Sequence, residues 1–318
     1  MGENMELSGS EVKPHIMVVG SSNTDMVIKM ERLPNPGETV LGGDFLMVPG
    51  GKGANQAVAA ARLGGAVTFI ARLGSDLFGD EALRNFQHEG IDTKFIVRDN
   101  EKPSGVALIF VDKHAENVIA VAPGANGRLS EKDLEQASEK MQACSVLVLQ
   151  LEVPLDTVKH AAKLGREKGL KVILNPAPVC EGGLPTELLE NVDVLLPNET
   201  EARMLLGMPV DAEIEQSIAR KLLDLGVGSA IVTMGAAGAL VVTRERVERV
   251  PSPKVNPVDT TAAGDAFTGA VAVSLAQGMD LFEAARLAVY AAALSVTKIG
   301  AQSSLPTARE VTIFKESA

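Results

Sequence analysis

The sequence predicts an α/β fold, in which a doubly wound and mainly parallel sheet carries helices on both faces and a small separate β-sheet is added. Short apolar runs alternate along the chain with longer segments of helical periodicity, which is typical of parallel strands joined by crossover helices. One of these runs, Val146–Leu149, is entirely apolar, as expected of a strand covered on both faces. Two further segments have a strand-like pattern and contain no convincing helix.

The elements of the main sheet follow one another in a regular order. Its predicted strands are 16–19, 67–71, 146–149, 171–174, 192–196 and 230–233. Helical spacing of apolar residues predicts helices at 54–63, 80–89, 131–141, 155–168 and 214–225. The segment 263–298 is rich in alanine and has no strand pattern, so the C-terminal third is expected to be helical.

The separate sheet is expected from about 25–49 and 104–122, where strand-like stretches are interrupted by polar and turn residues. The alternative is that these segments are extra edge strands of the main sheet. In either case we expect one α/β domain over 15–318. The preceding residues 1–14 are polar and acidic, without the apolar stretch of a secretory signal, and are expected to form a loose tail.

Composition excludes several classes of function. The 30 Lys and Arg against 41 Asp and Glu give a net charge of −11, which repels a phosphate backbone, and without Trp and with one Tyr the chain lacks base-stacking platforms. Nucleic acid is therefore not an expected partner. Two cysteines cannot form a disulfide framework and favour a reducing cytoplasm. No apolar run approaches the ~18 residues of a membrane span, so no membrane partner is expected.

Common nucleotide motifs are absent. Gly51-Lys52 is followed by glycine rather than the Ser or Thr of a phosphate-binding loop, and Gln56 stands where a dinucleotide fingerprint needs glycine. The segment 49–57 is still informative, because three glycines leading into a helix let a ligand approach backbone N–H groups at its positive end. The alternative is a connecting loop with Lys52 in solvent.

A stronger signal is the segment 259–267, where small residues and Gly264 lead into a helix. The N–H groups at about 262–265 are not paired by the helix ladder and can converge on an anion. Asp265 is then held beside a transferring phosphoryl group, as a general base for a hydroxyl proton must be. The alternative is that Asp265 only caps the helix.

Five segments together carry a resemblance to a known family. They are 23–25 (Asn-Thr-Asp), 50–57 (Gly-Gly-Lys-Gly-Ala-Asn-Gln-Ala), 175–178, 197–202 and 259–265. In these the chain resembles the ribokinase/carbohydrate kinase family, most of all its ribokinase branch, from about residue 15 to 306. The resemblance implies ATP- and Mg²⁺-dependent phosphorylation of the 5-hydroxyl of D-ribose. It also implies a β-sheet lid over the sugar, which often forms a homodimer contact.

The resemblance also implies roles for particular residues. Sugar binding is expected of Asn23, Thr24, Asp25, Gly51, Lys52, Gly53, Ala54, Asn55, Glu152 and Asp265. Asp265 is the expected base, with Ala262, Ala263 and Gly264 forming the anion hole. ATP is expected to contact Asn198, Glu201, Thr233, Met234, Gly235, Ala236, Ala237, Gly238, Gly264 and Asp265. A helix cap at Asn198 and a plain hairpin after Thr233 are the alternatives for those two segments.

A monovalent cation, K⁺, is a further implication of the resemblance. Its expected ligand positions are Asp259, Thr261, Ser295, Lys298 (through its carbonyl), Gly300 and Ser304. Such a cation orders the 262–265 loop without touching the substrate. One departure from the family pattern is Val289, which stands where related sequences often have a polar residue beside adenine.

Other functions compete with a ribose kinase. The nearest is another kinase of the same family, acting on fructose, deoxyribose or a nucleoside. A protein of a different class, a non-catalytic sugar- or nucleotide-binding regulator, has no need of a base such as Asp265. A nicotinamide-dependent oxidoreductase is disfavoured by the missing fingerprint.

Overall fold

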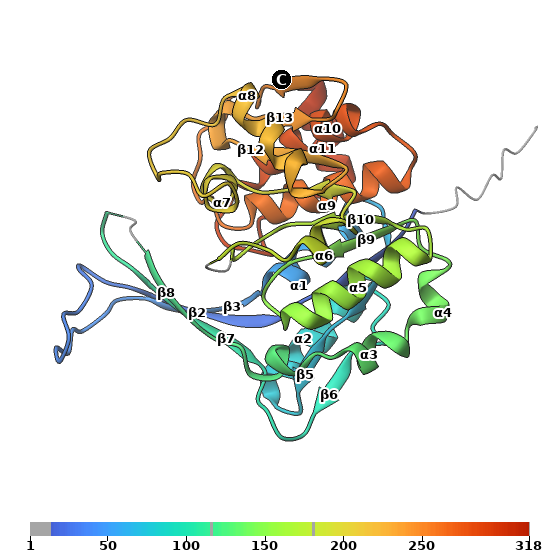
Figure 1. Ribbon diagram of the computed structural model, residues 1–318. Coiled ribbons are helices and arrows are strands. Elements are labelled where there is room, and N and C mark those ends of the chain that lie inside the picture. Colours follow the sequence, from blue (N-terminus) through green and yellow to red (C-terminus); the bar gives the residue numbers. More distant parts are fainter. Residues whose placement is uncertain (1–13, 115–116, 180–181, 318) are drawn as a thin grey trace, which may run out of the picture.

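The computed structural model describes residues 14–114, 117–179 and 182–317 (Figure 1). Except for Pro14, the expected tail lies outside these ranges. Within them, eight strands form the main sheet in the order β14-β13-β12-β11-β10-β9-β1-β4. These strands are β1 (His15–Val19), β4 (Ala66–Ile70), β9 (Val146–Leu149), β10 (Lys171–Leu174), β11 (Val194–Leu195), β12 (Ser229–Thr233), β13 (Ala239–Val242) and β14 (Val247–Val250).

The main sheet is parallel from β4 to β12 and ends in two antiparallel strands, β13 and β14. All six predicted strands are present, although 192–196 is shortened to the two residues of β11. The strand β14 was not predicted, but the antiparallel turn after Thr233 is the hairpin given above as an alternative. The antiparallel edge arises because the chain reverses at 234–238, where Met234 N donates to the Gly238 carbonyl, and a hairpin forms instead of a crossover.

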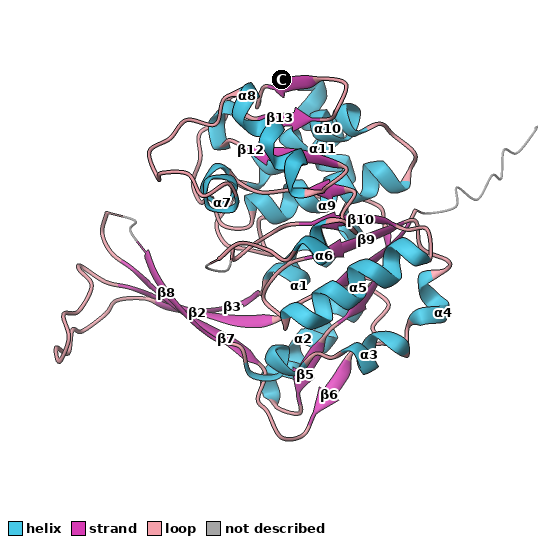
Figure 2. Ribbon diagram, viewed as in Figure 1, coloured by secondary structure: helices cyan, strands magenta, loops and turns pink. Residues whose placement is uncertain are grey.

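Helices cover both faces of the sheet (Figure 2). They are α1 (Lys52–Arg62), α2 (Leu77–His88), α3 (Glu131–Glu135), α4 (Ser138–Met141), α5 (Leu155–Glu167), α6 (Thr186–Leu189), α7 (Glu199–Leu205), α8 (Gln216–Ala219), α9 (Ala263–Ala276), α10 (Leu281–Ser295) and α11 (Ala308–Ser317). The helix expected at 131–141 is divided into α3 and α4, and the one at 214–225 becomes α8 followed by a 3₁₀ segment, Arg220–Leu225. No described helix is long and apolar enough to cross a membrane.

Two hydrophobic cores lie on opposite faces of the sheet. Along β1, Ile16 and Val18 face one core and Met17 and Val19 face the other, as the alternation of a strand requires. The first core packs against α1, α9 and α10, and the second against α3 to α8. Burial on both faces explains why strands such as Val146–Leu149 are entirely apolar.

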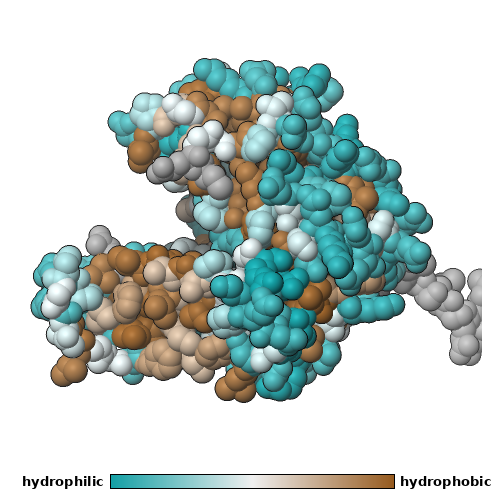
Figure 3. Space-filling model, turned by 60° about the horizontal axis from the view of Figure 1, so that its bottom comes forward, coloured by the Kyte–Doolittle hydropathy of each residue, from teal (hydrophilic) through white to brown (hydrophobic). Residues whose placement is uncertain are grey.

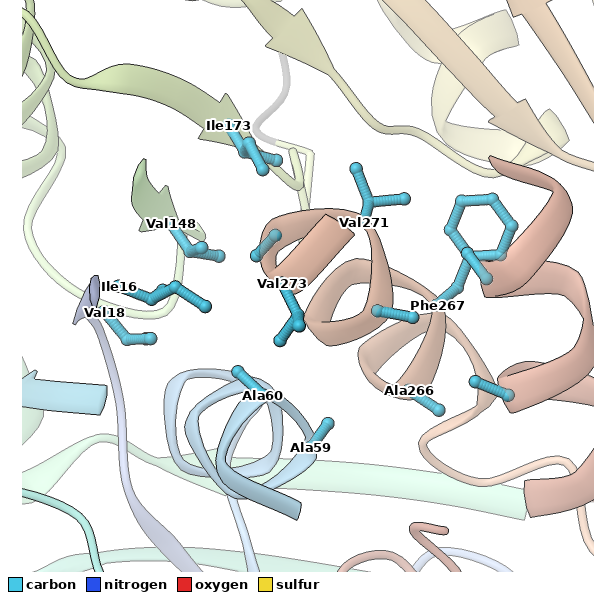
Figure 4. Close-up of a cluster of buried hydrophobic side chains, with 14 of the residues drawn as sticks. Ile16, Val18, Ala59, Ala60, Val148, Ile173, Ala266, Phe267, Val271 and Val273 are labelled. Atoms are coloured by element: carbon cyan, nitrogen blue, oxygen red, sulfur yellow. The ribbon is translucent and has the colours of Figure 1, made fainter. Parts of the chain in front are cut away.

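Helices α1 and α9 are in close contact within the first core (Figure 4). A Cβ added to Gly269 of α9 would lie 2.6 Å from the Ala59 Cβ and 2.9 Å from the Ala60 nitrogen of α1. Only glycine therefore allows this approach. The contact brings the N-terminal ends of the two helices to one end of the sheet.

The separate sheet consists of β3 (Phe45–Gly50), β2 (Asn23–Lys29), β7 (Gly105–Val111) and β8 (Asn117–Ala122), in that order. It stands out from the main body at the left of Figure 1, and we call it the projecting sheet. The alternative, in which these segments extend the main sheet, is wrong. A short pair, β5 (Arg72–Gly74) and β6 (Val97–Asp99), was not predicted.

Candidate active site

The site lies where the strand order of the main sheet reverses. From β1 the chain first adds β4 on one side and later β9 on the other, and ligands of open α/β sheets gather at the carboxyl ends of such strands. Ser21 to Asn23 follow β1, Gln150 to Glu152 follow β9, and Asn175 follows β10. These segments lie beside the N-terminal end of α1.

A cavity of about 210 Å³ opens at this end of the sheet. Eight of the residues that line it were predicted as site residues: Lys52, Asn198, Glu201, Thr233, Ala262, Ala263, Gly264 and Asp265. Asn175, Ala177, Leu196 and Thr260 also line it and had no predicted role. The structure therefore brings the first turns of α1, α7 and α9 together around one space.

Asp265 is the most constrained acid of this cavity. It is 7% exposed, and each of its carboxylate oxygens accepts one side-chain amide from α1. Asn55 Nδ2 donates to Oδ2 at 2.9 Å, and Gln56 Nε2 donates to Oδ1 at 2.9 Å. Burial raises the pKa of Asp265, while Lys52 and the two amides oppose that rise. A buried carboxylate with a raised pKa is suited to accept a hydroxyl proton.

The start of α9 presents backbone donors beside this carboxylate. Ala262 precedes the helix with φ 60°, the left-handed region, and it is the one non-glycine residue with positive φ in the described part of the chain. Ala263 N donates to the Thr260 carbonyl at 3.3 Å, so the predicted anion hole is smaller than expected. The N–H groups of Gly264 and Asp265 have no partner among the described residues and line the cavity.

The N-terminus of α1, by contrast, leaves only the Gly51 N–H without a partner among the described residues, because the next three are capped. Lys52 N donates to Glu152 Oε2 at 3.0 Å, and Ala54 N donates to the Ser21 carbonyl at 2.8 Å. Ser21 Oγ, 2.5 Å from the same Glu152 oxygen, accepts from Gly53 N. The prediction that a ligand approaches these N–H groups is therefore limited to Gly51, because distant residues cap the three N–H groups that follow it.

Two residues of the predicted sugar site, Gly53 and Ala54, have packing roles, and a third, Thr24, lies on the opposite side of β2 from Asp25. Ala54 is fully buried in the first core, so its side chain does not reach a ligand. A Cβ on Gly53 would lie 2.5 Å from Ser21 N, which makes this glycine a helix–strand contact. Side chains alternate along β2, so Thr24 faces away from Asn23 and Asp25 and lines a smaller hollow near α2.

Lys52 lies within reach of four carboxylates and is not a solvated loop residue. Burial lowers its pKa, but the charges of Asp265, Glu152, Glu201 and Asp25 outweigh burial and raise it. Its ammonium group is therefore positively charged in the cavity. Lys52 thus lies near Asp25 and Glu152 of the predicted sugar site as well as near Asp265 of α9.

The remaining polar residues of the predicted sugar site lie at the base of the projecting sheet. Asn23 Oδ1 accepts a hydrogen bond from Asn126 Nδ2 at 2.8 Å. The Asp25 carboxylate occupies the space over Gly50, where a Cβ would come within 2.2 Å of it. Gly51 has φ 88°, and a Cβ there would lie 2.7 Å from Asn23 N, so both conformation and space require glycine.

Burial raises the pKa of Asp25 to about 7, with Glu152 and Asp265 adding to the rise and Lys52 opposing it. In the unfolded chain the pKa of this carboxyl is 3.8. Its protonation therefore stabilises the folded protein at low pH, and this stabilisation is lost as pH rises from 3.8 to about 7. Asp25→Asn removes this dependence. We expect the variant to exceed the parent in free energy of unfolding by about 4 kcal/mol more at pH 8 than at pH 4.

Thermal melts of both proteins at pH 4, 6 and 8 measure this difference. The exposed substitution Asp211→Asn is the matched control and should show a constant offset. A constant offset for Asp25→Asn as well would contradict the assigned burial of this carboxyl.

Helix α7 has the predicted cap. Asn198 Oδ1 accepts from Glu201 N at 2.8 Å, and Asn198 N donates to Glu201 Oε2 at 2.9 Å. The capping role therefore holds, and both residues also line the cavity. Burial raises the pKa of Glu201, whereas the Asn198 N–H and Lys52 oppose the rise.

The segment Thr233–Gly238 forms the turn between β12 and β13. A Cβ on Gly238 would lie 2.0 Å from the Val250 carbonyl, so packing against β14 requires this glycine. Gly235 faces open space, and of the segment only Thr233 lines the cavity. The cavity thus does not extend along Met234, Ala236 and Ala237. Val289 is 3% exposed within the first core.

Two loops near α9 bring the predicted cation positions together. Asp259 Oδ1 accepts from Thr261 N at 2.9 Å, and Asp259 Oδ2 accepts from Gly300 N at 2.8 Å. Burial raises the pKa of Asp259, but these hydrogen bonds outweigh it and leave the pKa lowered. Val258 N also donates to the Val296 carbonyl, which joins the 258–261 loop to the end of α10.

The other predicted cation positions lie in the second of these loops. Ser295 and Ser304 are fully buried there, and the Ser295 carbonyl accepts from Lys298 N at 3.1 Å. The Lys298 ammonium pairs with Glu310 at 2.7 Å and is therefore not directed at a cation. A grouping of three or more His, Cys, Asp or Glu side chains suited to a metal is absent from the described ranges.

Several polar residues of the site were not predicted. Gln56 and Gln150 are 1% and 0% exposed and lie behind Asp265, and Asn126 holds the backbone at Ser22 as well as the Asn23 side chain. Gln150 and Asn175 directly follow β9 and β10. The carboxyl-end rule that singled out Glu152 could have found both.

Taken together, the cavity holds a buried carboxylate, free backbone donors and a lysine. Such a set can take a proton from a hydroxyl while it stabilises negative charge on a phosphoryl group. The family model described as pfkB family carbohydrate kinase matches residues 13–308.

Individual relatives match almost the whole chain. The chain is 43% identical to a deoxyribokinase of Salmonella typhi over 293 residues, covering 92% of this chain and 95% of that one. It is 42% identical to a ribokinase of Haemophilus influenzae over 304 residues, covering 95% and 99%. The solved structure of Arabidopsis thaliana ribokinase complexed with ribose and ATP matches with a TM-score of 0.86 and 33% identity, covering 95% and 99%. The chain therefore belongs to the pfkB family of carbohydrate kinases.

Proposed function

We propose that the protein transfers the γ-phosphoryl group of ATP to the 5-hydroxyl of D-ribose, giving ribose 5-phosphate and ADP. The observation that carries this proposal is the geometry of Asp265, which is fixed by two amides beside the free N–H groups at the start of α9. The proposal is supported by relatives that are named ribokinase and by one that was solved with ribose and ATP.

The reaction needs one proton acceptor and one anion site. Asp265 takes the proton of the sugar hydroxyl as the hydroxyl oxygen forms a bond to the γ-phosphorus. The bond between the γ-phosphorus and the bridging oxygen breaks, and that oxygen leaves with ADP. The Gly264 and Asp265 N–H groups donate to the phosphoryl oxygens, where negative charge is concentrated.

Lys52 and Glu201 bind the charged end of the nucleotide. The Lys52 ammonium offsets phosphate charge that the acidic cavity otherwise repels. Glu201 is the carboxylate of α7 that lines the cavity, and a single carboxylate suits Mg²⁺, which keeps several of its waters and binds mainly to phosphates. The bound Mg²⁺ neutralises charge on the phosphates. Asn198 fixes the Glu201 carboxylate through the capping box.

The sugar is bound between α1 and the base of the projecting sheet. Asn126 holds Asn23 Oδ1, which leaves the Asn23 amide group as a donor to a sugar oxygen. Glu152 uses Oε2 for the α1 cap, and its other oxygen remains for a hydroxyl. Asn55 Oδ1 is buried without a partner among the described residues, and a sugar hydroxyl satisfies it.

Deoxyribose is the second candidate substrate, because a deoxyribokinase is as similar to this chain as the ribokinases are. A site built from polar groups discriminates against an analogue that lacks one hydroxyl, since a buried polar group then stays unpaired. The number of polar groups around Asn23, Asp25 and Glu152 favours ribose.

The decisive experiment measures ADP release from ATP with ribose, 2-deoxyribose, fructose and adenosine under identical conditions. We expect kcat/KM to be highest for ribose, by about tenfold or more over 2-deoxyribose. A higher value for 2-deoxyribose would replace the proposed substrate and leave the chemistry in place. Absence of sugar-dependent ADP release would favour a non-catalytic binding protein.

A K⁺ ion is proposed at the joined loops 258–261 and 295–304. The hydrogen bond from Gly300 N to Asp259 already links these loops, and carbonyl and carboxylate oxygens are the ligands that K⁺ prefers. Both loops lie next to the start of α9. Bound K⁺ therefore acts by fixing the position of Ala262 and the donors that follow it.

The projecting sheet is proposed as a lid and as the contact of a homodimer. Large apolar side chains are exposed on both of its faces, and they gather on the arm at the left of Figure 3. They include Phe45, Leu46, Met47, Leu108, Val118, Ile119 and Val121, each 43–55% exposed. A sheet exposed on both sides needs a cover, and in a two-fold dimer the same patch covers itself.

The dimer is expected to depend on this patch. The protein should sediment as a dimer at micromolar concentration, and Ile119→Lys should shift it to a monomer, because a charge is buried in an apolar contact. Val210→Lys is the control, since Val210 is an exposed apolar residue of the main body at 85% exposure. A monomeric parent, or a dimer unaffected by Ile119→Lys, would exclude the contact.

A further inference from the structure

The Asp265 carboxylate accepts a hydrogen bond from the Gln56 side chain, which is itself hydrogen-bonded to two further amide side chains. Gln56 Nε2 donates to Asp265 Oδ1 and also to Asn175 Oδ1 at 3.0 Å. Gln56 Oε1 accepts from Gln150 Nε2 at 2.6 Å. Asn175 Nδ2 donates to the Leu196 carbonyl at 3.0 Å. We call these three side chains, Gln150, Gln56 and Asn175, the amide chain.

The orientation of every amide in this chain is determined by one backbone group. The Leu196 carbonyl can only accept, so Asn175 must direct its Nδ2 there and its Oδ1 towards Gln56. Gln56 must then direct Nε2 to Asn175 and to Asp265, and Oε1 to Gln150. If any one of these amides were reversed, two acceptors or two donors would face each other. The amide chain therefore presents a donor, and never an acceptor, to the base.

Gly20 leaves space for the amide chain, but one buried oxygen of the chain stays without a hydrogen bond among the described residues. A Cβ on Gly20 would lie 2.0 Å from Gln150 Oε1 and 2.9 Å from the Gly53 Cα. Glycine at position 20 thus leaves the room that Gln150 occupies. Gln150 Oε1 is nevertheless buried without a partner among the described residues, which is unfavourable for stability. A side chain that only filled space would serve better if it were apolar.

We propose that Gln56 and Gln150 are positioning residues for phosphoryl transfer, Gln56 by orienting the Asp265 carboxylate and Gln150 by preventing rotation of the Gln56 amide. This inference rests on the proposed role of Asp265 as the base. Each carboxylate oxygen accepts one amide hydrogen, so each keeps a lone pair for the sugar hydroxyl. Gln150 does not touch Asp265 and acts through Gln56 alone.

The electrostatic effect of this arrangement supports the same role. Burial raises the pKa of Asp265, as does Glu152, and the charge of Lys52 and the amides of Asn55 and Gln56 oppose the rise. More distant charges facing this space are Asp25 and Glu201, both near Lys52. Loss of the Gln56 donor is expected to raise the pKa of Asp265 further and to move the acidic limb of the kcat profile to higher pH.

The test compares Gln56→Met, Gln150→Met and the double variant, which keep volume and remove the amides. We expect kcat to fall by about 30-fold in Gln56→Met and by about fivefold in Gln150→Met, with KM for sugar and ATP changed less than threefold. The double variant should be no slower than Gln56→Met, because Gln150 acts only through Gln56. Thr157→Val is the control, since it removes a buried hydrogen bond to the Leu129 carbonyl in another part of the fold.

Additive losses in the double variant, or lower melting temperatures with unchanged kcat, would overturn the proposal. The proposed function is tested separately, by the activity of the parent protein with the four acceptors named above. An NMR titration of the Asp265 carboxyl carbon in parent and Gln56→Met tests the amide chain without any turnover. A higher pKa in the variant is the expected result, and an equal pKa would contradict it.

Discussion

Asp265→Asn is expected to lower kcat by about 10³-fold, because the variant cannot accept the proton of the sugar hydroxyl. The fold should be retained. The new amide oxygen can accept from Gln56, while Asn55, whose Oδ1 is free, can rotate to accept from the new NH₂ group. Steady-state kinetics together with a melting curve measure both effects.

The control for this substitution is Asp133→Asn. Asp133 is a buried acid that pairs with Arg72, far from the site. That variant should lose stability and keep the kcat of its folded fraction. Near-normal turnover of Asp265→Asn would remove the general base from the mechanism. A melting temperature lowered as much as in the control would mean that the loss of activity reflects unfolding.

Lys52→Met is expected to lower kcat/KM for ATP by about 100-fold, since it removes the positive charge that faces the phosphates. The same charge lowers the pKa of Asp25 and Asp265, so its loss should also raise both and move the acidic limb of the rate profile to higher pH. Initial rates over a range of ATP concentration, from pH 5 to 9, measure both changes.

Two variants delimit the role of Lys52. Lys52→Arg keeps the charge and should recover part of the activity at an unshifted pH profile. Lys132→Met changes an exposed lysine and should have no effect. A Lys52→Met variant with normal kcat/KM for ATP would mean that Lys52 serves only to balance the surrounding acids.

The architecture was largely predictable from sequence because it depends on local patterns. Strands buried on both faces are continuous apolar runs, and the projecting sheet was recognisable from two segments without helical periodicity. The antiparallel edge was foreseen only as an alternative, because Ala239–Val242 of β13 is as apolar as a parallel strand, whereas Val247–Val250 of β14 contains Glu248 and Arg249. Their direction depends on the short turn after Thr233.

The site was predictable where a helix end and its acid are adjacent in sequence, as at Gly264 and Asp265. It was not predictable where the partner is distant. The donors of α1 look free in sequence, but Lys52 N donates to Glu152, 100 residues away, and Ser21 accepts from the next two N–H groups. Gln56 and Gln150 are separated by 94 residues, and in sequence each looks like an ordinary polar residue of its own element.

The close contact of α1 and α9 at Gly269 separates the part of the site that holds Asp265 from the part that lies on the projecting sheet. Asp265, Asn55 and Gln56 belong to this packed pair of helices, so the packing of the core fixes the distances between them. Asp25 belongs to the projecting sheet, outside this packed pair of helices. Substitutions in the projecting sheet can therefore change what surrounds Asp25 without altering the distances between Asp265, Asn55 and Gln56.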